Sequence, residues 1–183
     1  RVVVAVPSGI TEVEKRAVKD SATRAGARDV ITIPEPMAAA IGVGLPIDEP
    51  AGSMVVDIGG GTSDIAVLSL GGIVQARSLR VAGNAFDEAI IRYVRRKHQL
   101  LIGEANAERI KIEVGSALLS ASPTDAEVHI RGRDLRQGRP KSAVLGPHDV
   151  AEALQSSMED LADFIQRALE ELPPEVSADI FER

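Results

Sequence analysis

The N-terminal part of the chain alternates strand, helix and strand, and this order constrains the fold more than any other feature of the sequence. Residues 2–6 are a continuous apolar run of the kind that forms a buried strand, and residues 30–33 are expected to form a second strand. Between them, Thr11 and Glu14 have the spacing of a capping box, and a helix with one apolar side follows as far as Gly26. Two strands joined by a helix predict parallel pairing with a right-handed crossover. We therefore expect an α/β fold whose sheet is at least partly parallel.

A triglycine turn lies further along the chain, between the apolar runs 53–56 and 65–70. Both runs have the length of buried strands, so the turn is expected to join them as a hairpin. Consecutive glycines let the backbone take positive φ values, so that successive amide groups can point into one anion-binding concavity. The candidate phosphate-binding residues are Gly59, Gly60, Gly61 and Thr62.

Acidic residues flank this turn. Asp57, at the end of the first hairpin strand, is repelled by phosphate but can hold the water molecules of a Mg²⁺ ion that bridges phosphate oxygens. The alternative is a tight glycine hairpin with Asp57 and Asp64 solvated at its ends, which turn chemistry alone would explain. The flanking acids together with Thr62 favour a nucleotide with its metal. The pattern is neither a P-loop nor a dinucleotide fingerprint, because the glycines lead into a strand.

Two further places carry candidate chemistry. Glu35 stands where a strand ends and a helix begins, a position from which a carboxylate can orient an attacking water for phosphoryl transfer. An acid that only complements the helix dipole explains the same position equally well. Glu108, Lys111 and Gly115 share one helix face and could bind ribose hydroxyls while leaving room for a base. A surface ion pair between Glu108 and Lys111 is the simpler explanation of that spacing.

Composition disfavours several function classes. The 183 residues include no cysteine and carry a formal net charge of −6, which argues against disulfide frameworks, thiolate metal sites and non-specific nucleic-acid binding. The three histidines lack metal-ligand spacing, and aromatic residues make up only 2% of the chain, too few for a stacking platform. No apolar run reaches transmembrane length, so we expect a cytosolic protein. The basic cluster within residues 131–141 is interpreted as a solvated loop or an inter-subunit contact.

The other expected elements follow from apolar periodicity and turn residues. Helices are expected at residues 37–42, from the acids Asp87 and Glu88 to Lys97, at 106–118, at 150–172 and at about 175–181. Strands are expected at residues 72–79, 127–130 and 142–145. Asn106 is the expected cap of its helix, whose core-facing positions are Ile110, Val114, Ala117 and Leu118.

Residues 57–64 resemble the second phosphate motif of the actin, Hsp70 and sugar-kinase superfamily, and residues 35–42 resemble its first connecting motif. Across essentially the whole chain the sequence is similar to the MreB family of bacterial actins, above all in residues 52–62 and 103–115. The resemblance implies an actin-like, ribonuclease H-like ATPase fold, in which helices flank a mixed sheet and a small α+β lobe is inserted. The segments it implies are residues 1–45 at the end of the first lobe, 46–115 and 147–183 in the second lobe, and 116–146 in the inserted lobe.

The resemblance also implies that ATP and Mg²⁺ bind between two lobes and that hydrolysis is slow. By this similarity Asp57 and Asp64 would organise the waters of the magnesium ion, although MreB-like sequences usually have glutamate at the position of Asp64. Glu35 would hold the nucleophilic water. The phosphates would contact Gly59, Gly60, Gly61 and Thr62, and the ribose and adenosine would contact Glu108, Lys111 and Gly115.

The family polymerises into protofilaments at the inner face of the plasma membrane and helps to determine rod shape through cell-wall synthesis. We therefore expect a cytoplasmic, membrane-associated protein whose partners are further copies of itself and membrane proteins of cell shape and cell-wall synthesis, with no nucleic acid. In the family, the first phosphate motif and the membrane-inserting segment precede the position of Arg1, and the glycine-rich adenosine motif follows Arg183. We expect the 183 residues alone to bind ATP weakly and to hydrolyse it poorly.

Three alternatives share parts of this pattern. An Hsp70-type chaperone ATPase has the same fold, but the lobe between the Glu108 helix and the long C-terminal helix is short for one. A non-hydrolysing actin-like scaffold would keep the fold and the polymer surface, and the intact Glu35, Asp57 and glycines argue against it. A sugar kinase would need a second substrate site, for which the sequence offers no pattern.

Overall fold

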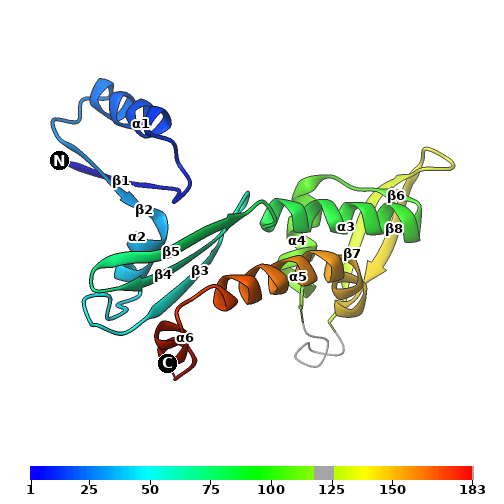
Figure 1. Ribbon diagram of the computed structural model, residues 1–183. Coiled ribbons are helices and arrows are strands. Elements are labelled where there is room, and N and C mark those ends of the chain that lie inside the picture. The colour runs from blue at the N-terminus through cyan, green and yellow to red at the C-terminus, as the bar shows by residue number, and fades with distance from the viewer. Residues whose placement is uncertain (118–125, 183) are drawn as a thin grey trace. The chain divides into compact units, whose positions relative to one another are not determined.

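The computed structural model describes residues 1–117 and 126–182 of the chain (Figure 1). The chain divides into two compact units. Unit 1 consists of Arg1–Arg80 and Phe164–Arg183, and unit 2 consists of Val81–Asp163. Within the described ranges, no helix is both long enough and apolar enough to cross a membrane.

Unit 1 begins with the predicted strand–helix–strand arrangement. Strand β1 (Val2–Val6) pairs in parallel with β2 (Val30–Pro34), and helix α1 (Glu12–Arg24) connects them. The Glu14 amide donates to the Thr11 hydroxyl at 3.3 Å, and the Thr11 amide donates to the Glu14 carboxylate at 2.9 Å. This reciprocal pair satisfies two amide groups at the helix start and confirms the predicted capping box.

The parallel pair is less buried than its apolar sequence predicts. Val2 and Val3 in β1 are 40% and 59% exposed, and no residue of α1 is buried. The prediction of a buried strand is therefore wrong for most of β1 within the described residues. Among the described residues this sheet has two strands. The main contact of α1 is with β2, and the short helix that follows β2 covers both strands only in part, which leaves much of their surface exposed.

Helix α2 (Glu35–Gly42) follows β2 without a loop and starts earlier than the predicted residue 37. Pro34 is its N-cap and Pro36 lies in its first turn, where a missing amide removes no helical hydrogen bond. Ala40 is fully buried, and α2 packs against β2 and against strands β3 and β4 of the next sheet. Helix α2 thus places Glu35 close to the strands that flank the glycine turn.

Strands β3 (Ser53–Ile58), β4 (Ser63–Ser69) and β5 (Gly72–Leu79) form an antiparallel sheet with β4 in the centre. Residues 65–68 of β4 are at most 2% exposed, so the sheet has a well-buried middle strand. Parallel and antiparallel pairing are both present, in separate sheets, and helices pack against each. The expected α/β class and the three strand positions are confirmed.

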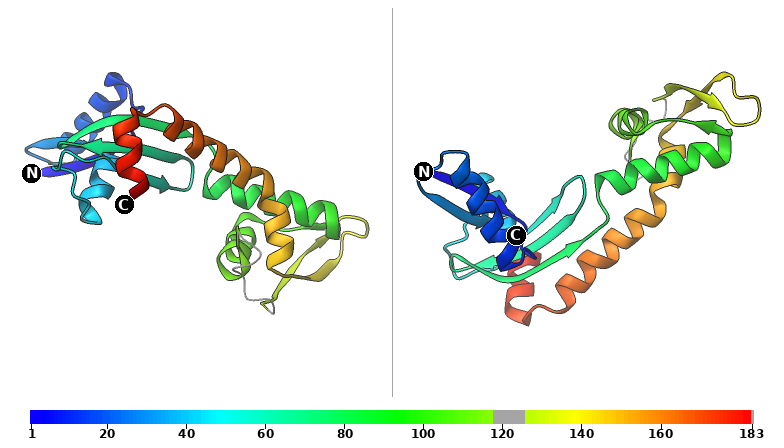
Figure 2. Two further views of the ribbon diagram at one scale, coloured as in Figure 1. Left: turned by 60° about the horizontal axis from the view of Figure 1, so that its bottom comes forward. Right: turned by 90° about the horizontal axis from the view of Figure 1, so that it is seen from above.

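The last two helices lie close to their predicted ranges. Helix α5 (Pro147–Glu170) ends before Pro173-Pro174, and α6 (Pro174–Glu182) follows. Helix α6 packs against β3 and lies beside the antiparallel sheet in both views of Figure 2. The end of the described chain therefore returns to the sheet that carries the glycine turn.

Unit 2 combines helices α3 (Gly83–His98) and α4 (Glu104–Val114) with the first part of α5 and an antiparallel sheet. The sheet has the order β6 (Leu100–Leu101), β7 (Val128–Asp134) and β8 (Pro140–Leu145). Side chains from the helices and the sheet share one core, whose members include Ile90, Tyr93, Val94, Leu100, Ile110, Ile130 and Leu145.

Helix α3 begins at Gly83, so Asp87 and Glu88 lie in its second turn and not at its start as predicted. No side chain caps this start. The basic residues from Arg95 to His98 lie in its last turn, where their charges complement the helix macrodipole. Acidic residues therefore mark the first half of this helix but not its boundary.

Helix α4 also begins earlier than predicted. It starts after Gly103, which puts Asn106 inside the helix, and it ends at Val114. Ala117 is exposed beyond the helix, and Leu118 lies outside the described residues. The two-residue strand β6 has no sequence pattern of its own, because its pairing with β7 defines it.

Gly132 in β7 lies directly against the backbone of β6. A Cβ atom at this position would lie 2.3 Å from the Leu101 carbonyl oxygen and 3.0 Å from the Leu100 side chain. We expect Gly132→Ala to lower the free energy of unfolding by about 1–3 kcal/mol, because the backbone of a paired strand cannot move aside without strain. Urea and thermal denaturation of the purified protein measure this change.

Gly42→Ala is the control for Gly132→Ala. No described atom lies within 4 Å of a Cβ at Gly42, and alanine has the higher helix propensity at the end of α2. The steric argument fails if Gly132→Ala is no less stable than Gly42→Ala.

Candidate functional site

Three carboxylates come together in unit 1. Asp57 on β3 directly faces Asp64 on β4 in the strand register, and Glu35 begins α2, which packs against both strands. Burial raises the pKa of Glu35, and the negative charges of Asp64 and then Asp57 raise it further. The structure therefore brings together the predicted water-positioning residue and the two predicted magnesium-organising residues.

Asp64 is the most buried of the three. It is 4% exposed, and its Oδ1 atom has no hydrogen-bond partner among the described residues. A buried carboxylate oxygen without a partner is costly, and like charges directly opposite each other in a sheet repel. A cation beside the two strands would offset both costs. The residues present therefore fit a bound cation.

This cation is expected to keep its water shell. Among residues 1–117 and 126–182, no group of three or more His, Cys, Asp or Glu side chains is arranged to hold a metal ion directly. Mg²⁺ dehydrates reluctantly and usually keeps several waters when it binds next to phosphate. The carboxylates therefore suit a hydrated Mg²⁺ that they contact through water molecules.

The glycine turn between β3 and β4 is a tight hairpin. The Gly59 amide donates to the Thr62 carbonyl oxygen at 2.9 Å, and Gly60 and Gly61 between them are exposed. None of these three described glycines has a positive φ, so the predicted positive-φ concavity is wrong. The reason is that strand pairing continues to the last residue before the turn, and the short closure needs no left-handed residue.

Gly59 and Gly61 also affect how much room there is around the turn. A Cβ at Gly59 would lie 3.3 Å from the Thr62 carbonyl oxygen, which is tighter than an ordinary contact. A Cβ at Gly61 would meet no described atom within 4 Å. The lack of a side chain at Gly61 therefore leaves open space next to the turn, where a ligand can approach the backbone.

The predicted ribose-binding residues lie in unit 2, separate from the unit that carries the carboxylates and the turn. Lys111 does not form the predicted surface pair with Glu108. Its Nζ lies 2.8 Å from the Asp87 Oδ1 and donates to the Gly83 carbonyl oxygen at 3.2 Å. Sequence spacing could not indicate this pair, because Asp87 belongs to a different helix. Glu108 is exposed.

Gly115 has a structural reason to be glycine. A Cβ at this position would lie 2.1 Å from the Lys111 carbonyl oxygen, which accepts the Gly115 amide at 3.0 Å. The end of α4 therefore requires glycine here with or without a bound base. The prediction that Gly115 makes room for a base rests on the family resemblance alone.

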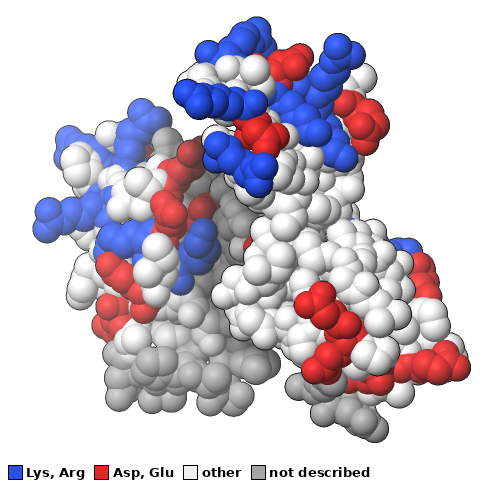
Figure 3. All heavy atoms as spheres, turned by 90° about the vertical axis from the view of Figure 1, so that its left-hand side faces the viewer, with Lys and Arg blue, Asp and Glu red and all other residues white. Residues whose placement is uncertain are grey.

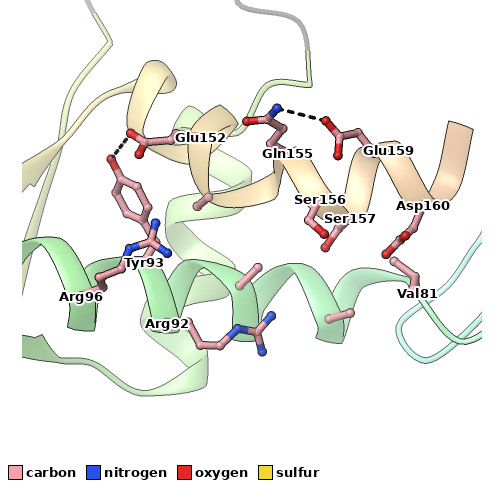
Figure 4. A pocket seen from close by; sticks show the side chains of 13 residues that line it. Val81, Arg92, Tyr93, Arg96, Glu152, Gln155, Ser156, Ser157, Glu159 and Asp160 are labelled. Atoms are coloured by element: carbon pink, nitrogen blue, oxygen red, sulfur yellow. Dashed lines mark hydrogen bonds between the residues drawn. The ribbon is translucent and has the colours of Figure 1, made fainter.

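A separate hollow of about 540 Å³ lies between α3 and α5 in unit 2 (Figure 4). At one end, the buried Tyr93 hydroxyl lies 2.8 Å from Asp149 and 2.9 Å from Glu152, and it also accepts from Lys97. Burial raises the pKa of Tyr93 to about 12, so its hydroxyl stays a donor at neutral pH. None of the predicted site residues lines this hollow, and the Tyr93 network ties α3 to the start of α5.

The basic cluster lies on the β7–β8 hairpin, with Arg131, Arg133 and Lys141 in its strands and Arg136 and Arg139 in the loop between them. Asp134 accepts the Arg136 and Gln137 amides at 2.7 and 3.1 Å, and its other oxygen lies 3.5 Å from Lys141. On the face shown in Figure 3, basic and acidic side chains lie next to one another in the upper part of the view, and acidic side chains predominate at the lower right. These contacts give Lys141 a role within the hairpin, and the inter-subunit contact stays a prediction.

The model of the family described as "MreB/Mbl protein" matches residues 1–183. The cell shape-determining protein MreB of Escherichia coli strain K12 is 54% identical over 185 residues, which cover 100% of this chain and 52% of that protein. The cell shape-determining protein Mbl of Bacillus subtilis strain 168 is 44% identical, over 100% of this chain and 54% of that protein. The chain spans about half the length of these relatives.

Solved structures agree with this assignment. The crystal structure of MreB 5 of Spiroplasma citri bound to AMPPNP has a TM-score of 0.93 and 39% identity, over 97% of this chain and 53% of that one. The MamK double helical filament, at 23% identity and a TM-score of 0.74 over 97% of this chain and 52% of that one, shares the fold. The actin-like fold is confirmed, and the chain belongs to the MreB/Mbl family.

Proposed function

We propose that the full-length protein is an ATP-binding, actin-like cytoskeletal protein that forms membrane-associated filaments and helps to determine rod cell shape by organising cell-wall synthesis. The relatives from Escherichia coli and Bacillus subtilis bear the name cell shape-determining protein. The Spiroplasma citri protein has been crystallised with AMPPNP and with ADP. The Hsp70 alternative has no support from these similarities.

The observation that carries the proposal is the pairing of Asp57 with Asp64 beside the triglycine turn. Two facing carboxylates next to an open backbone repel a bare polyphosphate and attract a cation. A nucleotide with its magnesium ion satisfies both the carboxylates and the turn. A glycine hairpin with no ligand leaves the Asp64 Oδ1 atom buried and without a partner.

The acids and the glycine turn have separate roles in binding, which follow from their chemistry. When bound, Mg²⁺ supplies the positive charge that offsets the phosphates and the carboxylates. Asp57 and Asp64 accept hydrogen bonds from its waters and so orient the ion. The backbone amides of Gly60, Gly61 and Thr62 donate to phosphate oxygens, while the missing side chain of Gly61 lets the phosphates approach. The Gly59 amide donates to the Thr62 carbonyl oxygen, so Gly59 contributes to phosphate binding by closing the turn.

Glu35 holds the attacking water. Its carboxylate sits at the start of α2 and is half-buried, so it can accept a hydrogen bond from a water next to the phosphates. Burial raises the pKa of Glu35, the charges of Asp64 and Asp57 raise it further, and the carboxylate is thereby a better acceptor for that proton.

On the nucleoside side, Glu108 is exposed and can accept hydrogen bonds from ribose hydroxyls. Lys111 uses its ammonium group for Asp87 and the Gly83 carbonyl, and a lysine ammonium has three protons. One proton is therefore left for a ribose oxygen. Gly115 leaves space for the base.

At the level of the cell, the protein would assemble with further copies of itself and act with membrane proteins of cell shape and cell-wall synthesis at the inner face of the plasma membrane. In the same proposal, residues 1–45 end the first lobe, 46–115 and 147–183 belong to the second, and 116–146 form the inserted lobe. A non-hydrolysing scaffold with the same filaments is the second candidate, and the action of Glu35 separates the two.

We expect Glu35→Gln in the full-length protein to slow phosphate release by about 10²- to 10⁴-fold, because glutamine cannot accept the proton of the attacking water. Nucleotide affinity should change little, because the phosphate and metal contacts remain. Glu88→Gln, which alters an exposed carboxylate on α3, is the control and should match the wild type. Phosphate release that is equally slow in wild type and Glu35→Gln would establish the scaffold instead.

We expect Asp57→Asn to have opposite effects without and with ligand. Without nucleotide, removing one of two facing charges should raise the free energy of unfolding by about 0.2–1 kcal/mol. With Mg–ATP, the rise in Tm caused by the ligand should be smaller than in the wild type, because the hydrated ion loses one anchor. Thermal unfolding with and without Mg–ATP measures both, and an unchanged ligand-induced rise would remove Asp57 from the site.

The stability of the nucleotide-free protein should depend on pH through Glu35. The pKa of Glu35 is higher in the folded protein than its ordinary value of 4.5, so the folded state binds this proton more tightly than the unfolded state. The free energy of unfolding of the wild type should therefore fall, relative to Glu35→Gln, as pH rises from about 4.5 through the raised pKa, and stay level above it. Urea denaturation of both proteins across this range tests this, and a constant difference contradicts it.

A further inference from the structure

The sheet that carries the glycine turn is held at both of its edges by the C-terminal part of the chain. In the order β3–β4–β5, β3 and β5 are the edge strands. Helix α6 packs against β3 and lies beside this sheet in both views of Figure 2, and the segment before α6 reaches β5. All of these residues belong to unit 1.

The contact at β3 joins a side chain to the backbone. The Gly52 amide, immediately before β3, donates to the Asp179 Oδ2 at 2.8 Å. A Cβ at Gly52 would lie 2.8 Å from the Val176 side chain and 3.6 Å from that of Asp179. Gly52 is buried, and its lack of a side chain is what lets α6 come this close. A hydrogen bond from an amide to an ionised carboxylate is among the stronger ones in proteins.

The contact at β5 is an ion pair between Arg77 and Glu171. The two side chains are 35% and 52% exposed, so solvent screens this pair. The Asp179 contact is therefore the stronger of the two ties. It is also the one on the strand that carries Asp57.

The start of β3 controls where Asp57 points. Ser53, the first residue of β3, is 6% exposed and pairs with Leu68, and Asp57 pairs with Asp64 near the other end. Because side chains alternate between the two faces of a strand, a shift of one residue would turn Asp57 to the opposite face. The turn hydrogen bond fixes one end of the strand, and the Asp179 contact fixes the other.

We propose that Asp179 is a positioning residue of the nucleotide site, which holds the start of β3 and so keeps Asp57 opposite Asp64. The part of this inference that concerns nucleotide rests on the proposed function. The part that concerns the strand does not, so the two can be tested separately.

The first measurement is hydrogen–deuterium exchange of the full-length protein without nucleotide. In Asp179→Ala, amides of residues 52–62 should exchange faster than in the wild type, because β3 loses its anchor. Asp179→Asn keeps an oxygen that can accept from Gly52 and should exchange like the wild type. Glu175→Ala removes another carboxylate of α6 that is exposed and is the matched control. Equal exchange of residues 52–62 in Asp179→Ala and wild type would overturn the proposal.

The second measurement is the affinity for AMPPNP with Mg²⁺. We expect Asp179→Ala to weaken binding roughly tenfold, the factor that corresponds to one charge-assisted hydrogen bond, and Asp179→Asn to restore most of it. Loss of affinity in Glu175→Ala to the same extent would contradict a specific role. If the wild type itself does not bind AMPPNP, the proposed function fails, while the exchange measurement still decides the strand anchor.

A second variant covers the case in which Asp179→Ala does not fold. Gly52→Ala keeps Asp179 but pushes α6 away from the backbone by the Cβ contact with Val176. It should give the same faster exchange in β3 and the turn. If Gly52→Ala folds and its residues 52–62 exchange at the wild-type rate, the proposed anchor is contradicted. Wild-type exchange in Asp179→Ala would contradict it in the same way.

Discussion

The register between β3 and β4 is the constraint on which the rest of the site depends. It sets Asp57 directly opposite Asp64, next to a turn whose glycines leave the backbone open. Two like charges in this position do not stabilise the sheet. A sheet that keeps them is therefore built at some cost to its own stability, and binding of a cation would offset this cost. The proposed magnesium nucleotide would supply that cation.

The surrounding elements help to hold β3 and β4 in this register. Helix α2 follows β2 without a loop and packs on β3 and β4, which carries Glu35 to the same pair of carboxylates. The central strand β4 is buried along residues 65–68, so it gives the sheet a fixed middle. Asp179 on α6 holds the start of β3 through the Gly52 amide. Two segments from outside the hairpin, α2 and α6, thus contact it, and each restricts a different part of it.

Local signals predicted local structure well. The Thr11–Glu14 capping box, the hairpin strands and the proline end of α5 depend on hydrogen bonds and sterics within a few residues, and all are present. The start of α3 was predicted less well: Asp87 and Glu88 do not mark it, since the helix begins earlier, at Gly83, with no side-chain cap. The expected positive φ at the glycine turn is also absent, because flexibility permits such a conformation but does not require it.

The sequence by itself determined the order of the elements, the glycine turn with its flanking acids, and the family resemblance that assigned their roles. Only the tertiary structure decided which groups meet: Lys111 with Asp87, Asp179 with Gly52, and a buried Asp64 oxygen left without a partner. The physical reason is how far apart in the sequence the interacting residues lie. Caps and turns are fixed by neighbours along the chain, whereas ion pairs and burial depend on how separate helices and strands pack, which no spacing within one element records.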